Sequence, residues 1–306
     1  MNYKSVFGSL VLVVFFSLQM IAQTSGYRIS APVSYKNLSV FLIHGKDEIK
    51  NKNILTLQEA MEKDLFVVYE TSDVNELMVE NKSSQYEVFI QSGDIVKGGK
   101  QDRVLAITII IPARSGKISI EAFCVESGRW EQRGKEKSGQ FSSSNERIVT
   151  KDLKIAANQT RSQGEVWKKV AEAQDKLSSN VGGRVNSEAS ASSLQLALEN
   201  KKVVATADEF INNLSGIIEG KDDVIGYAFV INGKINSADI YASNFLFKKL
   251  WLKLLKATAI EAVAEMKDGK QNKLVKISEI QSFMDDADSG KKEERKVNNR
   301  NKSVTR

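Results

Sequence analysis

A change of hydrophobic periodicity near residue 130 constrains the fold of this 306-residue chain more than any other feature. Between Ser30 and Trp130, short runs rich in Val, Ile, Phe and Tyr recur between polar breaks, which is typical of largely antiparallel strands. After residue 163, apolar side chains recur at three- and four-residue intervals, which predicts helices. The sequence therefore predicts an α+β fold with a β-rich N-terminal half and a helical C-terminal half.

Six runs carry the strand prediction: NLSVFLI, LFVVYET, ELMVEN, YEVFI, VLAITIII and KISIEAFCV. VLAITIII, at residues 104–111, is nearly continuous and indicates a strand buried on both faces. In KISIEAFCV, Ile118, Ile120, Ala122 and Cys124 fall on one side of the strand by alternation.

The helical half contains one hairpin signal. Asn232-Gly233 stands between two apolar runs and predicts strands near 225–231 and 234–241. Ser192 or Ser193 is expected to cap a short helix over LQLALEN. Ser243 or Asn244 then caps a long amphipathic helix, which should end near Asp268-Gly269 because glycine suits the residue just past a helix. On that helix Lys249, Lys253 and Lys256 form one stripe, which we expect to face solvent, whereas Glu261 falls on the apolar side.

The expected organisation is a single domain over residues 30–267, β-rich over 30–130 and mainly helical over 163–267. Residues 131–163 are polar and Ser-rich, so we expect a long loop there. Residues 285–306 are expected to form a disordered polar tail. Residues 291–306 hold seven basic and two acidic side chains, net +5, which is almost the whole net charge of +6. A nearly neutral body without interleaved aromatic and basic residues indicates no nucleic-acid partner.

The first residues predict export. Lys4, the apolar run that follows it and the small residue Ala22 are typical of a signal peptide over residues 1–22. No cysteine lies near the expected cleavage point, so we expect no lipid anchor and no stable membrane span after cleavage. The predicted location is the periplasm or the extracellular space.

Cys124 and His44 are the only cysteine and the only histidine of the chain. A single cysteine cannot form an intramolecular disulfide bond, and a zinc site of ordinary type needs more ligands of these kinds. We therefore expect no metal site and no cofactor, and we expect Cys124 to be a buried small side chain.

Two polar motifs adjoin predicted strands, and each has two interpretations. GGKQDR, at residues 98–103, is either a hairpin loop or a nest of backbone amides that receives a phosphate or carboxylate. CVESGRW, at residues 124–130, is either a closing turn at Gly128 or a ligand rim that includes Glu126, Arg129 and Trp130. A buried Glu261 would need a partner, for which Arg103 or Arg129 would serve.

Four segments together resemble the family of the ARG-and-Rhodanese-Phosphatase-superfamily-associated protein domain. They are GGKQDR (98–103), CVESGRW (124–130), VW (166–167) and INGKINSADIYASNFLFKKLWLKLLKATAIEA (231–262). The resemblance covers nearly all of residues 30–267. It implies an association with ADP-ribosylglycohydrolase and phosphatase-like proteins, and it implies no particular reaction.

Three functions follow as alternatives, and they leave open whether the chain is an enzyme. The first is a binding domain for an anionic small molecule or a protein partner. Its expected binding residues are Gly98, Gly99, Gln101, Arg103, Glu126, Arg129 and Trp130. The second is a hydrolase of phosphoester, ADP-ribose-like or glycosidic bonds that uses a carboxylate pair. Its candidate catalytic residues are Asp102, Glu126, Asp239 and Glu261. The third is a structural envelope protein.

Overall fold

The computed structural model describes residues 26–49, 53–147, 150–266, 274–290, 293–296 and 302–305. The predicted signal peptide lies outside these residues. The described chain is α+β, as predicted. Its strand pairings are antiparallel except for one parallel pair, β4 with β7.

A five-stranded sheet joins the two ends of the domain. Its strands, in chain order, are β1 (Tyr27–Ile29), β2 (Val33–Tyr35), β3 (Leu38–Gly45), β13 (Val224–Ile231) and β14 (Lys234–Ile240). The order across the sheet is β1-β3-β13-β14, with β2 also paired to β3. Asn232 and Gly233 both have positive φ and close the predicted hairpin of β13 and β14. Because β3 pairs with β13, the sequence halves are not separate structural halves.

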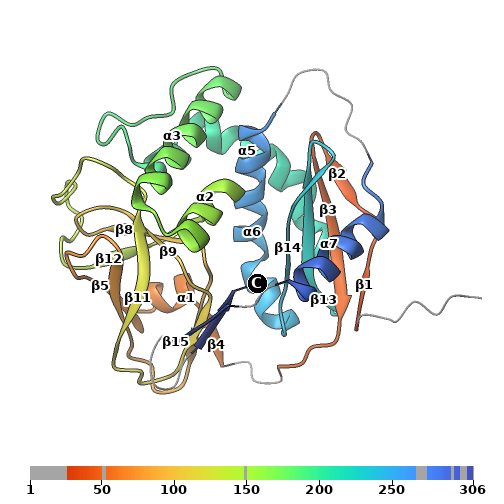
Figure 1. Ribbon diagram of the computed structural model, residues 1–306, viewed down its shortest axis with the longest axis horizontal. Helices are drawn as coiled ribbons and strands as arrows, with labels where there is room; N and C mark the ends of the chain where they lie inside the picture. Colours follow the sequence, from red (N-terminus) through yellow and green to blue (C-terminus); the bar gives the residue numbers. More distant parts are fainter. Residues whose placement is uncertain are drawn as a thin grey trace, which may run out of the picture.

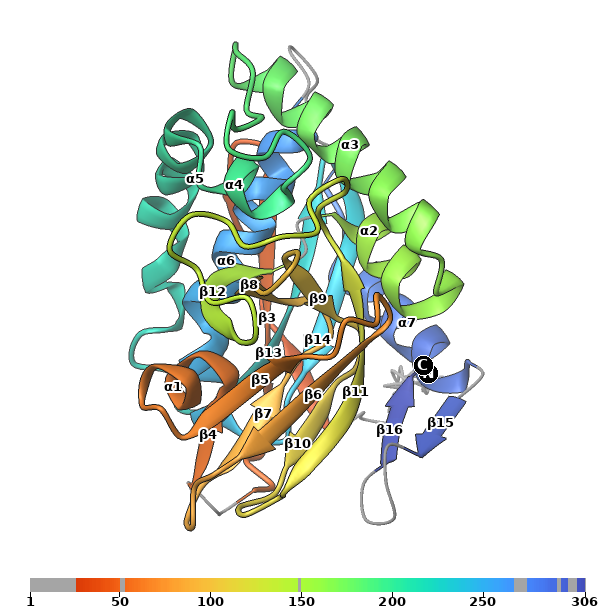
Figure 2. The same cartoon turned by 90° about the vertical axis from the view of Figure 1, so that its left-hand side faces the viewer.

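A six-stranded sheet forms the other side of the molecule (Figures 1 and 2). Its strands, in spatial order, are β12 (Phe141–Arg147), β8 (Asp94–Gly98), β9 (Arg103–Leu105), β11 (Lys117–Cys124), β6 (Glu76–Asn81) and β5 (Phe66–Glu70). A bridge between Tyr69 and Gln140 brings its two edge strands together. The sheet therefore closes almost into a barrel around its own apolar core.

A small three-stranded sheet and one helix complete this core. The strands are β4 (Ile54–Thr56), β7 (Glu87–Ile90) and β10 (Ile109–Ile111), and the helix is α1 (Leu57–Glu62). The run VLAITIII was expected to be one doubly buried strand, and this expectation is wrong. The run is divided between β9 and β10, which belong to different sheets, and Thr108 and Ile110 are exposed.

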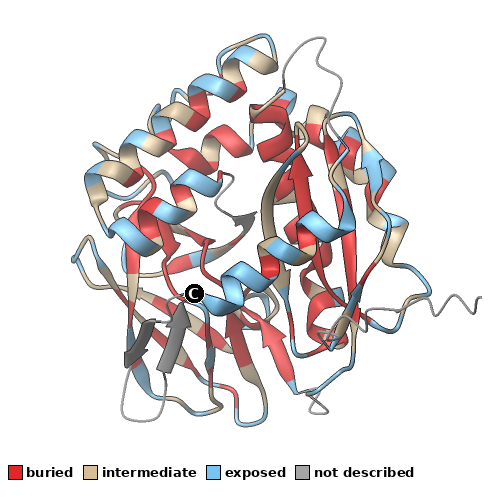
Figure 3. Ribbon diagram, turned by 45° about the vertical axis from the view of Figure 1, so that its right-hand side comes forward, coloured by how far each residue is buried: buried red, intermediate tan, exposed pale blue. Residues whose placement is uncertain are grey.

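Five helices pack into the main apolar core. They are α2 (Lys151–Ile155), which continues into a π turn at Ala156–Thr160, α3 (Gln163–Asn180), α4 (Leu194–Leu198), α5 (Lys201–Leu214), which continues into a 3-10 turn at Ser215–Ile218, and α6 (Asn244–Ala264). Ser193 and Ser243 cap α4 and α6 as predicted. The main apolar core lies among these helices and the facing strands, and Figure 3 shows buried residues along them.

Strand β11 lies between two cores. Ile118, Ile120 and Ala122 pack in the core of the six-stranded sheet, as their alternation predicts. Phe123 and Val125, on the opposite side of the chain, pack in the main core beside the helices. The second half of β11 is therefore buried on both faces, which places the following residues, 126–134, at the junction of the two cores.

Residues 131–163 are not one long loop. They contain β12 and α2, which the polar, Ser-rich composition hides. Strand β12 is held by pairing with β8, and α2 is capped by the Thr150 side chain. The first is a tertiary contact and the second a local one, and neither requires apolar residues at regular intervals in the sequence.

The C-terminal region also differs from the expectation of disorder. Helix α7 (Ile277–Ser289) extends past residue 285, and β15 (Glu293–Lys296) pairs with β16 (Lys302–Thr305). Ile280 and Met284 are buried against the outer face of the five-stranded sheet, beside Phe41 and Ile225. The partly buried Phe283 of the same helix packs beside them, and these three side chains dock the helix there. None of the described helices is long and apolar enough to cross a membrane.

Helix α6 lies between the six-stranded and the five-stranded sheet (Figure 1), and its lysine stripe is not a solvated face. Lys249 Nζ lies 2.9 Å from Glu59 Oε2, and Lys253 Nζ lies 3.2 Å from Asp94 Oδ1. The side chains of Lys253 and Asp94 are only 11% and 5% exposed. The expectation fails because acidic groups of α1 and β8 face this side of the helix.

The buried position of this ion pair predicts its effect on stability. We expect Lys253→Met, which keeps the apolar stem but removes the ammonium group, to lower the free energy of unfolding by about 2 kcal/mol. Lys248→Met on the same helix is the matched control. Lys248 pairs with Asp222, whose side chain is 93% exposed, so its loss should change stability by less than about 0.5 kcal/mol. Equal urea midpoints for the two variants would contradict this assignment.

Candidate functional site

The motif GGKQDR forms the connection between β8 and β9, as its hairpin interpretation predicts. Gly98 and Gly99 have φ of 117° and 57°, which favour glycine. A Cβ atom on Gly99 would lie 2.8 Å from Glu70 Oε2 and in still closer contact with Phe141 Cζ. Both the backbone angle and the space therefore require glycine at residue 99.

The backbone amides of this loop already have acceptors within the protein. The Gly98 amide donates to Asp102 Oδ1 at 2.9 Å, and the Gly99 amide donates to the Lys137 carbonyl at 3.2 Å. The Lys100 amide donates to Glu70 Oε2 at 3.0 Å. The amides of the predicted nest thus bind two of the protein's own carboxylates and one backbone carbonyl, and none is left for an external anion.

Asp102 is fully buried at the centre of this loop. Arg133 donates two hydrogen bonds of 3.0 Å to its two oxygens, and Ser193 Oγ donates a third of 3.0 Å. Burial raises the pKa of the Asp102 carboxyl above its usual range, although the Arg133 hydrogen bonds act in the opposite direction.

Glu126, from CVESGRW, contacts Arg133, as Asp102 does, and also contacts Arg129. Arg129 binds its carboxylate with both Nε (2.8 Å) and Nη2 (2.7 Å), and the Asp102 amide donates at 3.1 Å. Arg133 Nη1 adds a contact of 3.4 Å. Burial raises the pKa of Glu126, but the hydrogen bonds, led by those from Arg129, hold it below its usual range. The two motifs therefore converge, as the binding-site interpretation requires.

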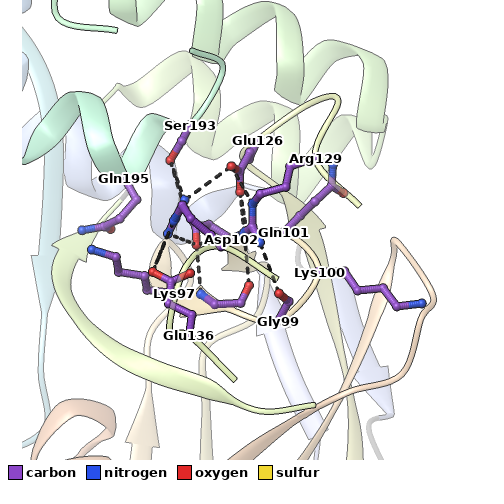
Figure 4. Close-up of polar contacts among 12 residues, drawn as sticks. Lys97, Gly99, Lys100, Gln101, Asp102, Glu126, Arg129, Glu136, Ser193 and Gln195 are labelled. Carbon is purple, nitrogen blue, oxygen red and sulfur yellow. Dashed lines mark hydrogen bonds and ion pairs between the residues drawn. The ribbon is translucent and has the colours of Figure 1, made fainter. Parts of the chain in front are cut away.

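We call this cluster the ion network; its members are Asp102, Glu126, Arg129, Arg133, Glu136 and Ser193 (Figure 4). An arginine has five N–H donors. Arg129 directs them to Glu126 and to the carbonyls of Gly98, Gly99 and Glu131. Arg133 directs its donors to Asp102, Glu126, Glu136 and Ser193. Neither guanidinium has a donor left for a ligand, so the role of these two arginines is to hold the loops together.

Arg103 behaves differently. Its side chain is fully buried, and its one carboxylate contact among the described residues is Nη2 to Glu70 Oε1 at 3.3 Å. Nη1 donates to Cys124 Sγ and, at 3.4 Å, to Gln101 Oε1, whereas Nε has no partner among the described residues. Cys124 is the buried small side chain that the sequence predicts, and burial raises the pKa of its thiol to about 11. His44, at the end of β3 in the five-stranded sheet, is hydrogen-bonded to Asp223, which directly precedes the neighbouring strand β13.

Trp130 lies over Arg103 at the surface. The Arg103 Cζ atom is 5.9 Å from the indole centroid, and Lys100 Nζ is 5.1 Å from it, distances at which cations attract an aromatic face. The indole is 47% exposed. Two open grooves adjoin this loop. One, of about 640 Å³, is lined by residues 127–129, 131–134 and 189–192, and the other, of about 540 Å³, by Gln132 and residues 137–140; Trp130 lines neither groove.

The other two candidate carboxylates lie elsewhere. Asp239 accepts a hydrogen bond from Tyr227 within the β13–β14 hairpin. Glu261 lies on α6, where its Oε1 accepts from the Lys151 amide (2.8 Å) and from Asn236 (2.9 Å). The expected pairing of Glu261 with Arg103 or Arg129 is therefore wrong. Instead of a cationic side chain, the Glu261 carboxylate contacts the N-terminus of α2, where the helix dipole favours a negative charge.

Sequence reasoning missed several members of the site. Glu70 ends a strand, and Arg133 and Glu136 lie in a segment expected to be only a loop. Ser193 was predicted as a helix cap, and its hydroxyl does accept from the Leu196 amide while it donates to Asp102. No short-range pattern marks Glu70 or Arg133, because their partners lie far away in the chain.

A family described as the ARG and Rhodanese-Phosphatase-superfamily-associated Protein domain matches residues 26–305. The chain belongs to this family. The match includes both motifs and also extends beyond residue 267, through α7 and the β15–β16 hairpin. No curated protein and no solved structure matches the chain.

The geometry of Gly99 gives a test of the loop in this family member. We expect Gly99→Ala to lower the free energy of unfolding by about 3 kcal/mol, because positive φ and a clash with Phe141 and Glu70 act together. Gly128→Ala is the control. Gly128 also has positive φ, of 81°, but a Cβ there would meet nothing within 4 Å, so a loss of about 1 kcal/mol is expected. Denaturant unfolding would contradict the packing argument if both substitutions cost the same.

Glu261 predicts a dependence of stability on pH. Burial raises its pKa to about 7 from an ordinary value of 4.5, so the folded state binds the proton more tightly than the unfolded state does. Its contribution to stability is fully present below pH 4.5 and is lost as the pH rises through 7. Glu261→Gln keeps the carbonyl acceptor but does not titrate. Relative to wild type it should gain up to about 3 kcal/mol between about pH 4.5 and 8. A parallel pH profile of the two proteins would contradict this assignment.

Proposed function

We propose that this chain is an exported binding domain that recognises an anionic small molecule carrying a sugar or planar ring. The single observation that supports this most is the exposed Trp130 indole on a loop that the ion network holds rigidly. An exposed indole on a well-held loop offers a ring-bearing ligand a large contact area. We use the name recognition surface for Trp130, Lys100, whose Nζ lies 5.1 Å from the indole centroid, and the exposed Lys135 and Lys137 of the segment that follows Trp130.

The charges of the recognition surface favour an anion. Lys135 and Lys137 are exposed, and their ammonium groups have no ion pair among the described residues. The Lys137 carbonyl accepts from the Gly99 amide, so this residue lies beside the glycine loop and lines the groove of about 540 Å³. Unpaired cations around a groove raise the local concentration of an anionic ligand.

Binding is better supported than hydrolysis by a carboxylate pair. Asp102 and Glu126 are neighbours, but each of their four oxygens already accepts two hydrogen bonds. Asp239 and Glu261 lie on other elements. General acid–base catalysis needs a carboxyl group within reach of the substrate, and the arrangement of these four gives no such group. A purely structural role would explain the ion network but gives no reason to expose Trp130.

Thermal unfolding against a ligand panel tests the proposal, since a ligand that binds the folded state raises the midpoint. The panel contains ADP-ribose, nucleotides, sugar phosphates and neutral glycans. We expect an anionic, ring-bearing compound to raise the midpoint of wild type by several degrees, and to raise it much less in Trp130→Ala. Leu252→Ala removes a similarly exposed apolar side chain, 59% exposed on α6, and should respond like wild type.

The proposal fails if no compound of the panel changes the midpoint of wild type. It also fails if an active compound acts equally on wild type and on Trp130→Ala, because the ligand would then bind away from the recognition surface.

A further inference from the structure

The three arginines around the glycine loop differ in how fully their donors are used. Arg129 and Arg133 have acceptors for all of their N–H groups, whereas the fully buried Arg103 has none for Nε among the described residues. We propose that Arg103 receives the oxyanion of the ligand, a phosphate or a carboxylate, and that the Trp130 indole is a movable cover over it. This inference rests on the proposed function and assigns its anion site.

The free donors of Arg103 suit an oxyanion. Nε and Nη2 lie on one edge of a guanidinium group and together form the fork that binds carboxylates and phosphates through two parallel hydrogen bonds. In Arg103 this edge has one contact of 3.3 Å, from Nη2 to Glu70 Oε1. The fork is therefore only partly occupied, and an incoming oxyanion would complete it.

Glu70 is not free to complete the fork itself. Its Oε1 accepts from the Ser72 amide at 2.9 Å, and its Oε2 accepts from the Lys100 amide at 3.0 Å. These two backbone donors fix the carboxylate beside the guanidinium in a position where it serves Nη2 alone. The position of Glu70 thus leaves the Arg103 Nε donor without an acceptor among the described residues. A buried donor without an acceptor is unfavourable, and a ligand oxygen at this position would remove that cost.

The local charge also favours an anion at Arg103. Arg103 and Lys100 carry two positive charges against the single negative charge of Glu70. In the ion network, two arginines face three carboxylates, those of Asp102, Glu126 and Glu136. An anion is therefore favoured on the Arg103 side of the loop and disfavoured on the other side.

Trp130 can act as the cover because its ring is half outside the protein. It is 47% exposed and its centroid lies 5.9 Å from the Arg103 Cζ atom. A bound oxyanion would lie beneath the displaced indole, and the rest of the ligand would extend over the recognition surface. Trp130 then has two roles, since it shields Arg103 in the free protein and stacks on the ring of the ligand in the complex.

Inorganic phosphate separates these two roles, because it has no ring to stack. We would measure its dissociation constant by calorimetry at constant ionic strength, with acetate as the carboxylate probe. Wild type should bind weakly. Trp130→Ala should bind several-fold more tightly because the cover is gone. Arg103→Lys, which keeps the charge but lacks the fork, should bind at least about tenfold more weakly. Binding of phosphate alone would assign a phosphate site, and equal binding of acetate would assign a carboxylate site.

Glu70→Gln keeps the inference testable if Arg103→Lys does not fold. The substituted amide would retain a carbonyl acceptor for one loop amide but remove the negative charge beside Arg103, so phosphate binding should strengthen. Unchanged or weaker phosphate binding by a folded Glu70→Gln variant would overturn the inference.

Two further outcomes would overturn it, and they separate it from the proposed function. If Arg103→Lys binds phosphate as wild type does, while Lys135→Gln/Lys137→Gln loses binding, the recognition surface stands and the Arg103 site is wrong. If neither phosphate nor acetate binds any variant, the Arg103 site is wrong. In that case the ligand panel decides separately whether the recognition surface survives.

Discussion

The packing of α6 between the two large sheets is the constraint on which the rest of the fold depends. One side of the helix packs in the main core beside the five-stranded sheet. On the other side, Lys249 and Lys253 reach Glu59 and Asp94 of the opposite layer. Partly buried ion pairs of this kind specify how two layers meet, because a misplaced layer would leave charges without partners.

The ion network applies the same principle at the loops. It ties together the β8–β9 loop, the segment after β11 and the start of α4, through Asp102, Glu126 and Ser193. Because the N–H donors of its two arginines and the carboxylate oxygens of Asp102 and Glu126 are all used, it provides rigidity and leaves none of these groups for a ligand. A charged motif with several arginines can therefore be structural. The distinction lies in which donors are already occupied, as the contrast between Arg133 and Arg103 shows.

The two motifs show what could be predicted from the sequence. The β8–β9 hairpin at GGKQDR was predicted, and the convergence of GGKQDR with CVESGRW was one of two interpretations. Glycine spacing and strand alternation are local properties, so the loop, the β13–β14 turn and the caps of α4 and α6 were all predictable. Convergence was only an alternative, because it depends on the pairing of β9 with β11. The roles of Arg133 and Glu70 were not predictable at all, since their partners are distant in the chain.

The sequence by itself determined the α+β class, the strand and helix segments with strong periodicity, the lack of an intramolecular disulfide and the motifs of the family. Those features follow from local propensity, side-chain period and composition. Only the tertiary structure decided that the lysine stripe of α6 docks on acids, that Glu261 caps α2, and that Arg103 alone of the three arginines around the glycine loop keeps an unused donor. Hydrogen bonds and ion pairs between distant segments depend on where the chain places each atom, and a one-dimensional pattern does not contain that information.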